Sequence, residues 1–243
     1  MKGLGALCAA AKDLVMPKDT VCLGCGDRTG LDHGPWLCDR CARRLTPAYH
    51  EIAPARLRDG LSKSWFGVSY ERPAAGVIKA VKFGGVWRAV PFLAGLLRPV
   101  IESGALSGFD ALVPVPLHPS RRRDRGFDQA ESIARALADL TGIPVRTDLL
   151  RRVKKTRAQA KTDYHRRAAN VSGAFDCPGR ADGLCLLLVD DVYTTGSTLS
   201  ACALALRGSG ARDVSAVTVA GSRYFRLHPG LVLYRPSAAA TRR

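Results

Sequence analysis

The sequence predicts an α/β fold, a parallel sheet with helices on both faces, preceded by a small four-cysteine module. Short apolar runs and helical patterns alternate along the chain in the order strand, helix, strand, helix, strand. Strands that are apolar at nearly every position are typical of parallel sheets, because helices cover both of their faces. Two Cys-x-x-Cys pairs near the N-terminus account for the small module, since this spacing is typical of a tetrahedral metal site.

The chain length fits one ordinary domain and one small module. Of the 243 residues, 47% are hydrophobic, which is enough for a real core. We expect residues 1–60 to hold an N-terminal helix, the metal module and most of a linker over residues 46–61. Residues 61–225 are expected to form the larger domain, and residues 226–243 a tail. Because no apolar run reaches the length of a membrane span, no membrane insertion is expected.

The net charge of +16 favours anionic partners such as phosphorylated metabolites, nucleic acid or an acidic protein. Much of the positive charge lies between residues 121 and 167, although a solvated basic face would give the same excess. The N-terminal residues are a poor signal peptide, because their initial charge is weak and further charge returns early. Together with cysteines in metal spacing, this indicates a reducing cytoplasm.

The two cysteine pairs predict one structural zinc ion. Cys22 and Cys25 form the first pair, and Cys38 and Cys41 form the second. Each pair places two thiolates on one ion, and four sulfur ligands leave no open position for chemistry. A redox Cys-x-x-Cys would not need a second copy. The remaining cysteines have no metal spacing and are expected to be ordinary buried thiols: Cys8, Cys177, Cys185 and Cys202.

Periodicity predicts the elements of the larger domain. Strands are expected over the alternating or apolar residues 64–70, 109–117, 186–189 and 214–220. Helices are expected over residues 73–83, 90–101, 128–140 and 199–209. Pro91 falls in the first turn of the second helix, and Gly142 stops the third.

Two acids and a group of hydroxyl residues follow the most apolar strand. Asp190 and Asp191 end the run, and the hydroxyl group surrounds a glycine where the next helix starts: Thr194, Thr195, Gly196, Ser197 and Thr198. Backbone N–H groups and the helix dipole make such a turn a phosphate site. The acids suit the vicinal hydroxyls of a sugar, or water around Mg²⁺. The stretch therefore favours a phosphorylated sugar at the carboxyl end of a strand.

Two other kinds of structure contain a similar stretch. The metal-holding strand of a P-loop ATPase also ends in acids, but it requires a Gly-x-x-x-x-Gly-Lys-Ser/Thr loop, which the sequence lacks. A core strand followed by a polar helix cap is the simplest alternative. Two acids and four hydroxyl residues exceed what a cap requires.

The stretch around Asp190 resembles the phosphoribosyl pyrophosphate signature of type I phosphoribosyltransferases. Two further motifs accompany it, Val-Pro-Val-Pro-Leu-His at residues 113–118 and Arg-Gly-Phe-Asp-Gln-Ala at residues 125–130. With the cysteine pairs, they make the chain resemble the ComF family from about residue 14 to about residue 223. That family joins an N-terminal zinc ribbon to a phosphoribosyltransferase domain, so the resemblance narrows the fold to the type I phosphoribosyltransferase fold.

The resemblance implies a site for 5-phosphoribosyl 1-pyrophosphate and Mg²⁺. It gives a catalytic role to Asp190 and Asp191, which hold the ribose hydroxyls, and assigns the 5-phosphate to residues 194–198. The other residues that it places at the ligand are Lys82, Pro116, Leu117, His118 and Arg125. In this superfamily the loop over residues 116–118 tends to hold a strained peptide whose N–H groups face the pyrophosphate.

Residues 149–175 form the most basic segment and have weak apolar periodicity. By resemblance they are the mobile catalytic loop that closes over the site, and the residues that match the family's spacing are Arg157, Gln159, Arg167 and Asn170. A basic arm that binds nucleic acid through charge is the alternative, and the two interpretations are compatible.

Two functions of different classes follow. The first is transfer of phosphoribosyl to an acceptor that the sequence does not identify, in a chain linked by its family to competence and DNA uptake. The second is a non-catalytic nucleic-acid-binding or adaptor module in DNA uptake or repair, which uses the basic arm and the zinc ribbon. The expected partners are phosphoribosyl pyrophosphate, single- or double-stranded DNA, and competence or repair proteins.

Overall fold

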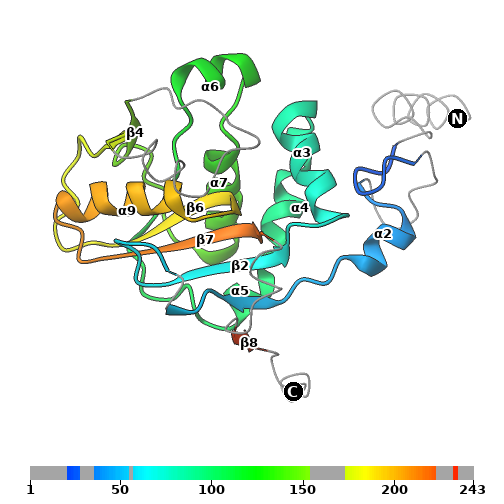
Figure 1. Cartoon of the computed structure of the whole chain (residues 1–243), viewed down its shortest axis with the longest axis horizontal. Helices are drawn as coiled ribbons and strands as arrows, with labels where there is room; N and C mark the ends of the chain where they lie inside the picture. The colour runs from blue at the N-terminus through cyan, green and yellow to red at the C-terminus, as the bar shows by residue number, and fades with distance from the viewer. Residues whose placement is uncertain (1–20, 28–35, 55–56, 154–172, 223–231, 235–243) are drawn as a thin grey trace, which may run out of the picture.

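The computed structural model describes residues 21–27, 36–54, 57–153, 173–222 and 232–234. Its centre is a six-stranded sheet in the order β3-β6-β7-β2-β1-β8 (Figure 1). The strands, in that order, are Ala111–Pro114, Cys185–Tyr193, Asp213–Gly221, Ser64–Ser69, Tyr49–Glu51 and Val232–Tyr234. The first four are parallel to one another, whereas β1 pairs antiparallel with both β2 and β8.

Helices cover both faces of the sheet, as the apolar strands predict. Along β6, Leu186 and Leu188 enter one apolar cluster, and Leu187 and Val189 enter the other, because successive side chains of a strand point to opposite faces. Helix α9 (Ser197–Gly208) covers the first face. The helices that pack on the second face are α3 (Ala74–Gly84), α4 (Val90–Gly95), α5 (Arg98–Glu102) and α7 (Gln129–Thr141). The predicted α/β class is therefore confirmed.

The single helix predicted over residues 90–101 is wrong, because the structure has two helices there, α4 and α5. Pro99 lies in the first turn of α5. It has no N–H to donate to Gly95, and its ring clashes with a helical carbonyl four residues earlier, so α4 does not run through it. By contrast, α7 is close to its predicted limits, with Asp128 as N-cap and Gly142 in the left-handed conformation (φ 75°) after its end.

Two segments predicted to lie outside the sheet belong to it. Residues 46–61, predicted as a linker, contain β1, and the predicted tail contributes β8. Each of these strands has three residues, too few for an alternating pattern to be visible in the sequence. The strand β2, predicted to alternate, is buried at its first five residues, because it lies between β7 and β1 and helices cover both faces.

A separate two-stranded ladder flanks the basic segment. β4 (Arg151–Arg152) pairs antiparallel with β5 (Phe175–Asp176), and a guanidinium nitrogen of Arg151 lies 2.7 Å from a carboxylate oxygen of Asp176. The residues predicted to form the mobile loop or the nucleic-acid arm lie between these strands and outside the described residues: Arg157, Gln159, Arg167 and Asn170.

The four-cysteine module packs on the face of the sheet that carries α3. Three of its cysteines and the apolar residues of α3 share one buried cluster, and the module's short helix α2 (Asp39–Arg44) lies on the side of the molecule away from α9 (Figure 1). None of the helices within the described residues is long and apolar enough to cross a membrane.

Candidate functional site

The two acids lie in the last residues of β6, at the carboxyl edge of the parallel strands. Asp191 is buried, and its Oδ2 lies 2.8 Å from the Nζ of Lys82. Lys82 comes from the last turn of α3, and its side chain is 21% exposed. The structure thus brings together, from elements far apart in the chain, three of the residues that the resemblance places at the ligand.

The carboxyl group of Asp190 has a perturbed pKa. Burial and the neighbouring Asp191 charge together raise the pKa of Asp190 to about 7, although the Lys82 cation opposes the rise. The Asp190 Oδ1 also accepts a hydrogen bond from the Asp191 backbone N–H at 2.8 Å. At neutral pH Asp190 is therefore close to half ionised, and a ligand that donates hydrogen bonds would favour its carboxylate form.

The hydroxyl residues form a tight turn into α9. Gly196 has a φ of +74°, and a Cβ there would lie 2.3 Å from the Tyr193 hydroxyl oxygen, so only glycine fits. The N-cap residue of α9, Gly196, makes no side-chain hydrogen bond to the helix. The Ser197 N–H lies 3.4 Å from the Thr195 hydroxyl, which also contacts the Ser197 hydroxyl at 3.0 Å. Thr194 is exposed, and Thr198 is half-buried. Such a turn offers N–H groups and hydroxyls to an anion.

Arg58 supports this turn and was not predicted. Its Nε donates a hydrogen bond to the Thr195 carbonyl oxygen at 2.9 Å, and its Cγ would lie 2.9 Å from a Cβ at Gly196. The residue lies in the segment predicted as a linker and belongs to no motif. Because the contact joins residues 137 positions apart, no local pattern could indicate it.

The loop over residues 116–118 follows β3, next to the acids. Pro114 pairs with Val189 in β6, and the Val115 N–H donates to the Val189 carbonyl at 3.0 Å. His118 caps α6 (Pro119–Arg125), since its Nδ1 accepts a hydrogen bond from the Ser120 N–H at 3.2 Å. The loop therefore begins at the same sheet edge as the acids.

The strained peptide expected in this loop is not found. Within the described residues, no residue other than glycine has a positive φ, and the one cis peptide bond joins Arg72 and Pro73. The Leu117 N–H does not face outward either, because it donates to the Asp128 Oδ2 at 3.0 Å. The Leu117 N–H thus has its hydrogen-bond partner within the chain, in an ordinary backbone conformation.

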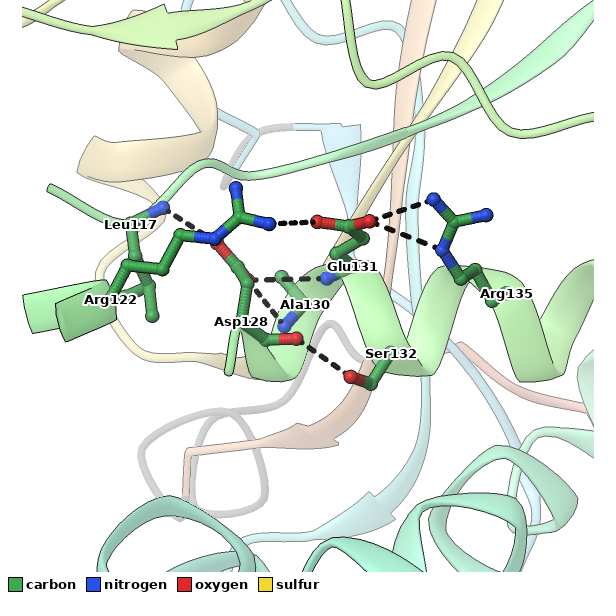
Figure 2. A network of polar contacts seen from close by, with 7 residues as sticks. All are labelled: Leu117, Arg122, Asp128, Ala130, Glu131, Ser132 and Arg135. Atoms are coloured by element: carbon green, nitrogen blue, oxygen red, sulfur yellow. Dashed lines mark hydrogen bonds and ion pairs between the residues drawn. The ribbon is translucent and has the colours of Figure 1, made fainter. Parts of the chain in front are cut away.

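Asp128 joins the loop to α7 (Figure 2). Its Oδ1 accepts hydrogen bonds from the N–H groups of Ala130 at 3.0 Å and Glu131 at 3.2 Å, and its Oδ2 accepts the one from Leu117. Burial raises the pKa of Asp128, and its charge adds to the rise in the pKa of Asp190. The sequence predicted the cap but not the contact with the loop.

One arginine beside the loop, Arg122, is tied to α7. The Arg122 Nη2 lies 3.3 Å from the Glu131 carboxylate, which also binds Arg135 at 2.8 Å (Figure 2). Arg123 is exposed. Arg125 ends α6, but its side chain lies outside the described part of the chain, so its predicted contact with pyrophosphate stays a prediction.

The four cysteines of the module converge on one point. The ligand sulfur atoms of Cys22, Cys25, Cys38 and Cys41 all lie within 4.8 Å of one another. The Cys25 and Cys38 sulfurs are 3.9 Å apart, close to the ~3.8 Å expected for two thiolates bound to zinc at ~2.3 Å in a tetrahedron. The residues present therefore fit one zinc ion.

The thiol acidities fit a metal site as well. Burial raises the pKa of Cys22, but backbone N–H groups, among them that of Cys38 at 3.3 Å from the sulfur, lower it to about 6. Burial and the neighbouring cysteines raise the pKa of Cys41. Thiolates that lie this close together repel one another. A cation bound between them would neutralise their negative charge. Of the thiols outside the cluster, Cys202 is buried, Cys177 and Cys185 are half-buried, and Cys8 lies outside the described residues.

Comparison with curated proteins identifies homologues with related names. DNA utilization protein YhgH of Salmonella typhi is 28% identical over 216 residues, which cover 87% of each chain. Competence protein F of Haemophilus influenzae is 31% identical over 156 residues, 60% of this chain and 66% of that protein. Competence protein ComFC of Bacillus subtilis is 27% identical over 218 residues, 85% of this chain and 86% of that protein. The resemblance to the ComF family is thereby confirmed, although no family model matches the chain.

Two solved phosphoribosyltransferases overlap the chain loosely. A purine phosphoribosyltransferase from Pyrococcus horikoshii matches with a TM-score of 0.33 and 20% identity, over 57% of this chain and 74% of that one. An adenine phosphoribosyltransferase from Leishmania tarentolae matches with a TM-score of 0.33 and 13% identity, over 74% of this chain and 85% of that one. At these scores the overlap adds nothing to the sheet order and helix positions described above.

Replacing Asp128 with alanine should destabilise the protein by about 1–2 kcal/mol, because the N-cap of α7 and the contact with Leu117 are lost together. Asp128→Asn should cost less, since asparagine is an equally good N-cap. The free energy of unfolding in urea measures both effects. Asp139→Ala, on an exposed position of the same helix, is the control and should change little. A loss in Asp128→Ala no larger than in the control would refute the role of Asp128.

Proposed function

We propose that this chain binds 5-phosphoribosyl 1-pyrophosphate with Mg²⁺ at the carboxyl edge of the sheet, and that it transfers the phosphoribosyl group to an acceptor. The observation that carries the proposal is the Lys82–Asp191 ion pair beside Asp190. The turn into α9, which begins three residues after Asp191 and has glycine at the N-cap, adds an anion site. The acids can accept hydrogen bonds from the hydroxyls of a ribose, and the neighbouring N–H groups can bind its phosphate.

In this proposal each part of the site has a separate task. The turn over residues 194–198 holds the 5-phosphate, and Arg58 keeps that turn in place. Asp190 and Asp191 accept hydrogen bonds from the ribose hydroxyls and stabilise the positive charge that develops on the ring as pyrophosphate leaves. The loop over residues 116–118, with Arg125, lies on the side of the pyrophosphate. Positioning and electrostatics, without a covalent enzyme intermediate, supply the rate.

Two metal ions belong to the proposal. Carboxylate oxygens at the strand end suit Mg²⁺, which would neutralise charge on the departing pyrophosphate. Zinc would occupy the four-cysteine cluster, where all four coordination positions come from the protein and its role is structural. Every cysteine within the described ranges is a free thiol, which suits a reducing compartment such as the cytoplasm.

Titration calorimetry with phosphoribosyl pyrophosphate and Mg²⁺ tests the site directly. The wild type should bind, and the double variant Asp190→Asn/Asp191→Asn should lose most of the binding, because its amides keep the shape but not the charge of the acids. Leu204→Ala, which changes an exposed residue of α9, should bind like the wild type. Absence of binding to the folded, zinc-loaded wild type would refute the proposal.

Binding should also weaken as the pH falls. Because the pKa of Asp190 is raised to about 7, its carboxylate is mostly protonated at pH 6 and mostly ionised at pH 8. If only the carboxylate accepts the ribose hydroxyls, the affinity should be about tenfold lower at pH 6 than at pH 8. The variant Asp190→Asn is the control. Its affinity should vary with pH only through the ligand's own phosphates, because its amide does not titrate. The same pH dependence in this variant and in the wild type would contradict the role of Asp190.

A second function, binding of single-stranded nucleic acid, is favoured by an aromatic surface next to the site. The side chain of Phe83 is 74% exposed and that of Trp87 is 59% exposed. The Arg88 guanidinium carbon lies 5.4 Å from the centre of the Trp87 ring, and Lys82 precedes Phe83. Exposed rings beside cations suit stacked bases and their phosphates. The net charge of +16 and the names of the homologues point in the same direction.

The matched pair Trp87→Ala and Leu204→Ala tests this surface. Both remove an exposed apolar side chain, but only Trp87→Ala should weaken binding of single-stranded DNA, by about 1–3 kcal/mol in fluorescence anisotropy. The salt dependence should stay unchanged, because tryptophan contacts no phosphate through charge. Equal affinity of the two variants would remove Trp87 from the nucleic-acid interface.

A further inference from the structure

We infer that the four-cysteine module positions Lys82: it clamps the first turn of α3, and α3 holds Lys82 against Asp191, so that metal loading of the module is linked to the phosphosugar site. The structural part of this inference rests on contacts alone. Its consequence for ligand affinity rests on the proposed function.

The module and the start of α3 touch through their backbones. A Cβ at Gly76, in the first turn of α3, would lie 2.1 Å from the Leu23 carbonyl oxygen and 2.9 Å from that of Gly24. A Cβ at Gly24, between the first two cysteines, would lie 2.6 Å from the Cβ of Pro73 and 2.9 Å from the Cys41 sulfur. Contact this close leaves no room for a side chain on either surface.

Polar and apolar contacts extend this interface. The Arg72 Nη1 donates a hydrogen bond to the Cys25 carbonyl oxygen at 3.2 Å. Cys22 and Cys41 are buried in the same cluster as Ala74 and Val77. The metal ligands themselves therefore form part of the surface on which α3 rests.

The other end of α3 carries the site residue. The helix has 11 residues and spans about 16 Å at 1.5 Å per residue. Its apolar face is fully packed, since Val77, Ile78 and Val81 are each at most 1% exposed. A packed helix of this length moves as one body, so a shift of its first turn displaces its last. Lys82, in that last turn, is the one cation paired with Asp191 within the described residues.

The clamp depends on metal because the module has little structure of its own. Within residues 21–27 and 36–44, α2 is the single helix and has six residues. A segment this small rarely folds on its own core, and metal binding supplies its folding free energy. Without the ion, nothing holds the carbonyl groups of Leu23 and Gly24 against Gly76, and the first turn of α3 loses this contact.

Amine labelling tests the structural part without any ligand. Lys79 and Lys82 lie on the same helix, but Lys79 is exposed, whereas Lys82 is 21% exposed and ion-paired. Removal of zinc with a chelator should raise the acylation rate of Lys82 several-fold, measured by mass spectrometry, and leave that of Lys79 unchanged. An unchanged rate for Lys82 after verified release of zinc would overturn the inference.

Two glycines of α3 give a matched pair of variants. Gly76→Ala places its methyl group against the module, whereas at Gly84 the nearest atom to a new Cβ lies 3.8 Å away. In the zinc-loaded protein, Gly76→Ala should expose Lys82 to labelling and Gly84→Ala should not. Circular dichroism checks that both variants fold. If Gly76→Ala fails to fold, the acylation rate of Lys82 in the chelated wild type still tests the inference.

A double-mutant cycle separates positioning from general destabilisation. Gly76→Ala should lower the affinity for phosphoribosyl pyrophosphate in the wild-type background, but not in a Lys82→Met background, where nothing is left to position. Equal losses in both backgrounds would show a merely structural effect and overturn the inference. If the wild type binds no phosphoribosyl pyrophosphate, the proposed function fails, and the labelling experiment alone decides the link between module and Lys82.

Discussion

The placement of two consecutive carboxylates at the end of β6, with Asp191 buried and Asp190 half-buried, is the constraint on which the site depends. Neighbouring acids removed from water repel each other, and each loses solvation that only a cation or hydrogen-bond donors can replace. Lys82 supplies the cation to Asp191, and the strand's own N–H supplies a donor to Asp190. Because Lys82 belongs to α3, this ion pair joins the last turn of that helix to the acids, and apolar packing holds the helix along its length.

The parts of the fold that depend on local pattern could be predicted from the sequence. The apolar run before Asp190, the cap at Asp128 and the cysteine spacing each depend on residues close together in the chain, and each is present in the structure. The break of the helix at Pro99 also follows from local chemistry, although an apolar periodicity hid it.

The contacts that assemble the site could not be predicted in this way. The hydrogen bond from Arg58 to Thr195 joins a segment without a motif to the phosphate turn, and the one from Leu117 to Asp128 joins two motifs that were treated separately. The resemblance placed Lys82 near the ligand, but its partner Asp191 appears only when the sheet register is known. Tertiary contacts of this kind leave no periodic trace, because they depend on how the elements pack against one another.

The antiparallel edge of the sheet has a consequence for synthesis of the chain. Tyr49, His50 and Glu51 in β1 pair with residues 232–234 in β8, so β1 is covered by a strand that is translated much later. Until residue 234 has been translated, β1 presents an open row of N–H and C=O groups, which other strands tend to join. The nascent protein therefore passes through a period in which its aggregation depends on how quickly translation is completed and β8 docks.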